Sequence, residues 1–241
     1  MGSDSWFPTK LVGERVVLRR HVPANVEAFR RWYADPRVAR LTRYQDGPMR
    51  PVEIERFFIS RVVGPDSLAL AIHLRSSGRL IGTCAFSQLD GDNGSALFHI
   101  TIGEVDAWSR GYGTEATQLM LQHGFGTLHL HRVSLSVFEF NERAIRAYRR
   151  CGFRVEGRAR EAIWRDGRRW DELNMSILAQ EWADRAETRG RIRATAPVSG
   201  RAVIASRDST VASEKSTGAS MAPGVASTAP AVASAATIGG D

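Results

Sequence analysis

The sequence predicts one mixed α/β domain, because strands linked by hairpins are followed by a crossover of alternating helix and strand. The hairpin-linked part consists of three β-rich runs at residues 67–74, 80–87 and 96–103. Ser77-Gly78 and the run 90–94 separate them, and both have the composition of hairpin turns, so the three strands should be antiparallel neighbours. After Gly111 the apolar spacing becomes helical, and a β-rich run and a second helical pattern follow at residues 132–138 and 141–150. This order is typical of a parallel crossover.

The remaining elements flank this centre. A short β-rich run at residues 14–19 opens the domain. Pro23 then begins a helical pattern that Asp35-Pro36 should stop, and a second helix should follow Pro51. At the other end we expect two strands around the turn at residues 165–168, then an amphipathic stretch at 179–187.

Composition divides the chain into three parts. Residues 1–10 read as an N-terminal extension and residues 11–189 as the packed domain, rich in Leu, Val, Ile, Phe and Trp between charges. Residues 190–241 consist mainly of Ala, Ser, Thr, Gly and Pro without aromatics, so we expect a disordered tail. The tail is either an inert extension or a partner-binding segment, because composition alone names no partner.

The formal net charge of +7 comes almost wholly from arginine. It suits nucleic acid, an acidic partner or a polyanionic cofactor, and solvated surface arginines would give the same balance. No nucleic-acid-binding module is present. Cys84 and Cys151 lie far apart in apolar runs, as expected of core residues in a reducing compartment. With no secretory signal or long apolar run in this sequence, we expect a cytoplasmic protein without membrane segments.

A glycine-rich loop precedes the first helix of the crossover. Gly111 and Gly113 permit unusual backbone angles and close approach of a ligand, and the helix that follows offers free N–H groups to phosphate oxygens. Arg110 adds a cation. The run Gly111-x-Gly113-x-x-Ala116 also satisfies a loose dinucleotide-binding pattern, but that pattern belongs to a parallel sheet, whereas hairpin-linked strands precede it here. A third interpretation is that the glycines only end a strand and start a helix.

Several ordered motifs resemble the GNAT superfamily of N-acetyltransferases over residues 12–183. The family motif R/Q-x-x-G-x-G/A is similar to Trp108-x-x-Gly111-x-Gly113, and tryptophan at its start is typical of the branch that includes the RimJ and RimL ribosomal-protein acetyltransferases. Further similar segments are Trp32-x-x-Asp35-Pro36-x-Val38, His131-Arg132-Val133, Asn141-x-x-Ala144-Ile145-x-x-Tyr148-x-x-x-Gly152-Phe153, Gly157-Arg158 and Arg165-Asp166-Gly167-Arg168.

This resemblance implies a mostly antiparallel sheet of six to seven strands that contains one splayed parallel pair, with about four helices around it. It also implies acetyl-CoA, or another short acyl-CoA, as co-substrate, with its pyrophosphate on the glycine loop and its pantetheine arm between the splayed strands. The residues that the resemblance assigns to this co-substrate are Ile102, Gly103, Glu104, Arg110, Gly111, Tyr112, Gly113, Thr114, Asn141 and Tyr148.

Acyl transfer to an amine needs a neutral amine, a polarised carbonyl and a proton for the departing thiolate. The resemblance makes Tyr148 the proton donor, and Tyr148 lies two helical turns after Asn141, on the same side. A buried structural tyrosine is the alternative. The carboxylates that relatives use as general base are replaced by Leu97 and Ser136, which leaves His99, Glu104 or a water chain for this role.

These features predict an enzyme that transfers an acetyl group to a primary amine. The RimJ/RimL resemblance favours a protein N-terminus; polyamines, amino sugars and antibiotics are alternatives, as is a degenerate domain that binds acyl-CoA without turnover. We expect no metal, because His129 and His131 lack a third ligand nearby, and we expect a monomer or homodimer. Arginines crowd the segments expected to form the acceptor pocket and could favour an acidic acceptor: Arg40, Arg43, Arg50, Arg165, Arg168 and Arg169.

Overall fold

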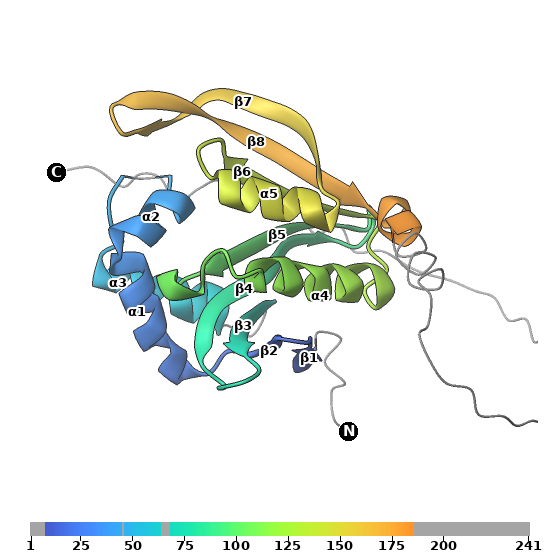
Figure 1. Ribbon diagram of the computed structural model, residues 1–241, viewed down its shortest axis with the longest axis horizontal. Coiled ribbons are helices and arrows are strands. Elements are labelled where there is room, and N and C mark those ends of the chain that lie inside the picture. Colours follow the sequence, from blue (N-terminus) through green and yellow to red (C-terminus); the bar gives the residue numbers. More distant parts are fainter. Residues whose placement is uncertain (1–7, 45, 64–67, 186–241) are drawn as a thin grey trace, which may run out of the picture. The chain divides into compact units, whose positions relative to one another are not determined.

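The computed structural model describes residues 8–44, 46–63 and 68–185, so the predicted tail lies outside the described residues. Eight strands form one sheet in the order β1-β2-β3-β4-β5-β6-β8-β7 (Figure 1). The mixed α/β prediction is confirmed. The sheet has eight strands where at most seven were expected, because a short edge strand precedes the first predicted one. The strands are β1 (Lys10–Val12), β2 (Val16–Arg20), β3 (Ala69–Leu74), β4 (Leu80–Asp90), β5 (Ser95–Ile102), β6 (Arg132–Phe138), β7 (Arg154–Arg165) and β8 (Arg168–Leu178).

The parallel pair is formed by β5 and β6 and is splayed. Only Ser95, Ala96 and Leu97 pair with β6, opposite the run from Arg132 to Ser134. Beyond that point β5 pairs with β4 as far as Ile102, and β6 pairs with β8 as far as Phe138. A gap therefore opens between two central strands, and hydrogen-bonding edges face each other across it.

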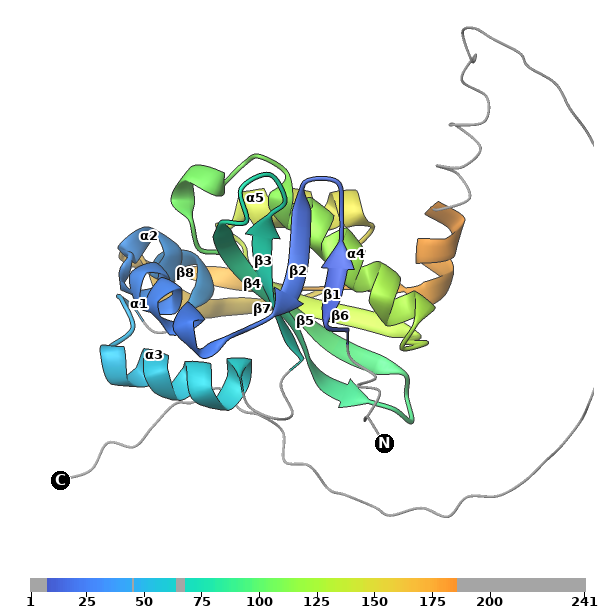
Figure 2. The same cartoon turned by 90° about the horizontal axis from the view of Figure 1, so that it is seen from below.

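One face of the sheet is covered by α4 (Tyr112–Gly126) and α5 (Glu142–Cys151), which lie side by side in Figures 1 and 2. Alternate strand residues point toward these helices, as the two-residue period of a strand requires. The resulting core contains Leu18, Leu70, Phe98, Val133 and Met175 from the sheet, packed against Ala116, Met120, Ile145 and Cys151 from the helices. Both cysteines are buried and reduced.

A second core packs α1 (Val26–Ala34), α2 (Pro36–Thr42) and α3 (Pro51–Phe57) against the opposite face, with Phe29, Trp32, Val38 and Ile54 at its centre. The sequence did not predict α2, since Asp35-Pro36 reads as a helix stop. In the structure Asp35 accepts a hydrogen bond from the Arg37 N–H at 2.8 Å and Pro36 is the first helical residue. The same two residues therefore end one helix and start the next.

Shorter elements complete the domain. A 3-10 turn follows Val22 (Pro23–Asn25), a π-helical turn extends α3 (Phe58–Val62), and another 3-10 turn precedes the glycine loop (Val105–Ala107). The amphipathic stretch is helical from residue 179 to the last described residue, 185. In the part of the chain that the structure describes, every helix is too short or too polar to cross a bilayer.

Candidate functional site

The glycine loop begins α4 in a conformation that leaves N–H groups available. Gly111 is the N-cap residue of α4, with φ +81° in the left-handed region, and makes no side-chain cap hydrogen bond. The first intrahelical bond runs from the Glu115 N–H to the Gly111 carbonyl at 3.1 Å. The N–H groups of the first turn, from Tyr112 to Thr114, therefore point out of the helix, where the positive end of the helix dipole also lies. This arrangement suits an anion.

Arg15, on the turn between β1 and β2, holds this loop in place through hydrogen bonds and an ion pair, which we call the Arg15 brace. Its Nη1 donates to the Arg110 carbonyl at 2.9 Å, and its Nε donates to Glu115 on α4 at 3.0 Å. The same carboxylate accepts from the Arg15 N–H at 2.8 Å. Glu115 thus forms an ion pair with Arg15.

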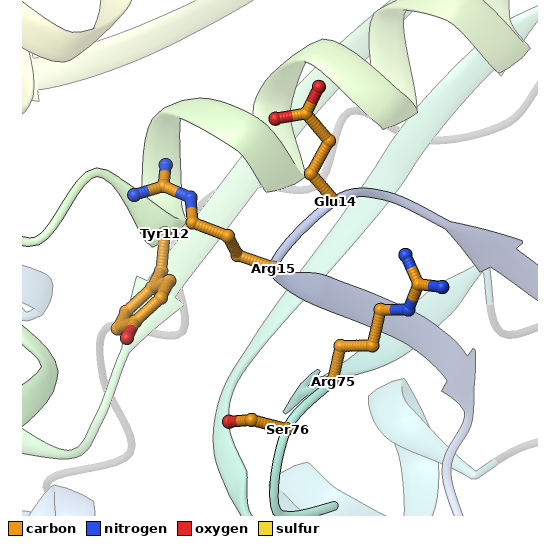
Figure 3. Close-up of a pocket in the computed structure, with 5 residues that line it drawn as sticks. All are labelled: Glu14, Arg15, Arg75, Ser76 and Tyr112. Atoms are coloured by element: carbon orange, nitrogen blue, oxygen red, sulfur yellow. The ribbon is translucent and has the colours of Figure 1, made fainter.

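A pocket of about 410 Å³ lies beside this brace. Figure 3 shows Arg15 reaching toward the start of α4 next to Tyr112, while Arg75 and Ser76 come from the turn between β3 and β4. The pocket lies toward β2 and β3, whereas the gap in the sheet is between β5 and β6. It is therefore separate from the gap.

The last residues of β5 line one edge of the gap. The Gly103 and Glu104 N–H groups both donate to the Ile81 carbonyl on β4, at 2.9 and 3.2 Å. Because N–H directions alternate along a strand, the N–H groups of Ile100 and Ile102 point the other way, into the gap. Trp108 donates its indole N–H to the Ile102 carbonyl at 2.6 Å, which ties the glycine loop to this edge.

Glu104 is held away from the gap by α1. Its carboxylate accepts from the Trp32 indole at 2.9 Å and from Arg31 at 3.3 Å. The Trp32 ring also lies where a side chain on Gly103 would be, about 2.0 Å from an ideal Cβ. Through these two contacts Glu104 links α1 to the end of β5.

Asn141 and Tyr148 belong to the N-cap and the body of α5, the helix that covers one face of the sheet beside the gap. Asn141 is the N-cap residue, and its side-chain oxygen accepts from the Ala144 N–H at 3.3 Å. Tyr148 is buried, and its ring packs edge-on against Phe153 at 5.7 Å between centroids. Burial raises the pKa of Tyr148 above its ordinary value, so its hydroxyl stays protonated at neutral pH. Among the described residues nothing hydrogen-bonds to that hydroxyl.

His99 lies on the opposite face of the sheet from Tyr148. Its Nε2 is 2.7 Å from the Ser87 hydroxyl, and desolvation lowers its pKa below the ordinary value although the residue as a whole is exposed. By register, Ser136 occupies the corresponding position across the gap, and its hydroxyl donates to the Asn174 side chain at 2.9 Å. The polar side chains of Ser87, His99, Ser136 and Asn174 therefore lie on neighbouring strands across this face of the sheet.

Glu172 lies one step further along this face and was not among the sequence candidates. It faces Phe138 across the β6–β8 pair, and its carboxylate accepts a hydrogen bond from the Tyr44 hydroxyl. The alternation of Glu172, Asn174 and Ser176 with buried apolar residues is a period-two signal that could have identified it. What the sequence could not supply is Tyr44, which arrives from the segment after α2.

The arginines expected around the acceptor pocket are engaged in local contacts. Arg165 is almost fully buried and donates to Asp46 at 2.6 Å, while Arg40 donates to Asp166 at 3.1 Å. The rest contact carbonyls, carboxylates or aromatic faces: Arg43 with Gly47, Arg50 with Glu53, Arg168 with Trp170 and Arg169 with Trp164. Within residues 8–44, 46–63 and 68–185 no group of three or more His, Cys, Asp or Glu side chains could hold a metal ion.

Relatives in sequence carry acetyltransferase names. The uncharacterized N-acetyltransferase p20 of Bacillus licheniformis is 28% identical over 178 residues, which cover 72% of this chain and 98% of p20. The spermidine N(1)-acetyltransferase of Escherichia coli K12 is 28% identical over 114 residues, 47% of this chain and 61% of that enzyme.

Solved structures share the fold. The spermidine N-acetyltransferase of Vibrio cholerae, solved with CoA and spermine, superposes with a TM-score of 0.62 at 21% identity, over 71% of this chain and 99% of that one. The family model for the acetyltransferase (GNAT) domain matches residues 15–154, which include β2 to β6, the glycine loop and α5. The chain therefore belongs to the GNAT family and is an N-acetyltransferase.

Proposed function

We propose that the donor is acetyl-CoA and that its pyrophosphate binds the start of α4 while its pantetheine arm lies in the gap between β5 and β6. The observation that carries this proposal is the first turn of α4, whose N–H groups are left uncapped by Gly111 beside the Arg15 brace. Backbone N–H groups at a helix start bind phosphate oxygens well because the helix dipole adds to the hydrogen bonds. Ile100 and Ile102 supply strand-like partners for the amides of the arm.

In this proposal Tyr148 protonates the departing thiolate and His99 removes the proton from the amine. Their positions on opposite faces suit the reaction, because His99 can accept a proton from an amine that adds to the thioester carbonyl on one face, while Tyr148 donates a proton to the departing sulfur from the other. A histidine whose pKa is lowered by desolvation is neutral at pH 7 and able to accept a proton. Glu104 has no catalytic role here, since its carboxylate already binds Trp32 and Arg31.

The acceptor is a primary amine. The resemblance to the RimJ/RimL branch supports a protein N-terminus, and the named spermidine acetyltransferases among the relatives support a small-molecule amine. We define the acceptor side of the gap by the side chains of Tyr44, His99 and Glu172, which come from three separate segments of the chain.

The Gly111→Ala variant tests donor binding. A Cβ at this position would lie 2.9 Å from Arg15 Nη2 and would sit on a φ of +81° that L side chains rarely adopt. The Cβ pushes the Arg15 guanidinium aside and the strained φ displaces the N–H groups of the loop. Isothermal titration with CoA should therefore give a Kd at least ~10-fold higher than for the unsubstituted protein, the equivalent of about 1.4 kcal/mol.

Gly167→Ala is the matched control. Gly167 also has a positive φ, +73°, but has open space around its Cβ and lies on the turn between β7 and β8. It therefore reproduces the backbone strain without touching the loop, and its Kd for CoA should stay within about twofold of the original. Equal losses of CoA affinity in both variants would contradict the placement of the pyrophosphate.

A further inference from the structure

The Glu172 carboxylate has an unusual environment on the acceptor side of the gap. It is partly buried on β8, and its Oε1 accepts from the Tyr44 hydroxyl. Tyr44 is itself positioned by packing edge-on against Phe138, with 5.3 Å between ring centroids. The second carboxylate oxygen has no hydrogen-bond partner among the residues that the structure describes. A partly desolvated carboxylate with a free oxygen is a cation-binding group.

The neighbouring charges are already matched in pairs. Asp46 accepts from the buried Arg165, and Asp166 accepts from Arg40. Of the three described carboxylates Asp46, Asp166 and Glu172, Glu172 is the one whose hydrogen-bond partner, the phenol of Tyr44, carries no charge. The arginines that surround the acceptor side therefore do not neutralise Glu172, and its negative charge stays available to a ligand.

The register of the sheet places Glu172 within reach of the gap. It lies beside Phe138, which is two residues beyond Ser136 on the same face of β6. Successive residues on one face of a strand are about 6.6 Å apart, twice the rise per residue. Glu172 is one such step beyond the level of Ser136 and one strand over, on β8, so with strands about 4.8 Å apart the two Cα atoms are about 8 Å from each other. The glutamate side chain and a short alkyl chain between two nitrogens together cover this span.

We propose that Glu172, held by Tyr44, binds a second, positively charged nitrogen of the acceptor while the first nitrogen is acetylated at the gap. The site thereby selects diamines and polyamines over amines with one nitrogen and over acidic acceptors. This inference rests on the proposed function. Tyr44 acts as a positioning residue: its hydroxyl fixes the carboxylate of Glu172, and its ring packs against the alkyl chain of the acceptor.

The test compares 1,4-diaminobutane with butylamine, which differ only in the second nitrogen. Thiol release from acetyl-CoA gives kcat/KM for each, and the unsubstituted enzyme should prefer the diamine. The preference ratio is kcat/KM for the diamine divided by kcat/KM for butylamine. In Glu172→Gln the KM for the diamine should rise and this ratio should fall by about tenfold, which corresponds to the loss of one charge-assisted hydrogen bond. Tyr44→Phe keeps the ring but loses the hydroxyl, so the ratio should fall by about two- to threefold.

Glu161→Gln is the control, since Glu161 is an exposed carboxylate on the same hairpin and should keep the original ratio. A ratio that is the same in Glu172→Gln and in the unsubstituted enzyme overturns the inference, as does the absence of any preference for the diamine. Either result leaves the proposed function standing if butylamine is acetylated. Failure with every amine, despite CoA binding, counts against the proposed function itself.

Discussion

The Tyr148 hydroxyl is the group in the site whose chemical role is easiest to isolate. Phenylalanine keeps the edge-on contact with Phe153 and removes only the oxygen. If Tyr148 protonates the thiolate, Tyr148→Phe should lower kcat by roughly 100-fold, the lower end for general acid catalysis. The Kd for CoA, measured by titration, should change by less than about threefold because the phosphate contacts are untouched.

An unchanged kcat in Tyr148→Phe would make Tyr148 a packing residue that closes α5 against the sheet. A variant that loses CoA affinity and turnover to the same extent would point to the same conclusion. Stability measured in urea separates these cases from misfolding, since the substitution leaves the buried ring in place.

His21 makes stability depend on pH through a ring that the proposed reaction does not use. Its ring lies between Asn25 and Thr83, at 3.2 and 3.0 Å, and edge-on to Phe29. Burial lowers its pKa from 6.5 to about 4. The unfolded chain therefore binds the proton first, and stability that is complete above pH 6.5 is lost as the pH falls toward 4, by at most about 3 kcal/mol.

Urea unfolding of His21→Gln at several pH values measures this contribution. The variant should show a shallower fall in the free energy of unfolding between pH 6.5 and 4 than the unsubstituted protein. His131→Gln replaces an exposed histidine and should keep the original slope. Parallel pH curves for His21→Gln and the unsubstituted protein would show that His21 remains accessible to protons in the folded state.

At the scale of elements, the sequence predicts best where one short segment contains both the pattern and its boundary. The strand at 132–138 coincides with β6, and the helices after Gly111 and Asn141 begin within a residue of their predicted starts. Glycine at a strand-to-helix junction and Asn at an N-cap are local signals. The helix α2 was missed for the same local reason, because Asp35-Pro36 fits a helix end and a helix start equally well.

The parts of the site that depend on distant elements could not be read from the sequence. Arg15 and Glu115 are 100 residues apart, and nothing near either one indicates that they meet. Likewise Tyr44 and Glu172 are 128 residues apart, and their contact depends on how the segment after α2 packs against β8. The glycine loop was predictable because its N–H groups, its glycines and its helix are consecutive in the chain.

At the scale of the whole domain, the order of the strands creates the site. A sheet with only antiparallel neighbours would have no central break, whereas the β5–β6 pair separates after three residues and leaves two strand edges facing each other. Helices α4 and α5 cover one side of this break, and α1 to α3 with the β7–β8 hairpin border the other. In the proposed function, donor and acceptor approach this gap from opposite faces.

The most direct test of this arrangement is the release of CoA thiol from acetyl-CoA with and without added amine, with the product identified by mass spectrometry. If the chain acetylates amines at the gap, thiol release should depend on the amine and the product should carry one added acetyl group. The panel should include diamines, polyamines, monoamines and peptides with free N-termini. A protein that binds CoA yet releases no thiol with any of these amines would contradict the proposed acetylation of amines.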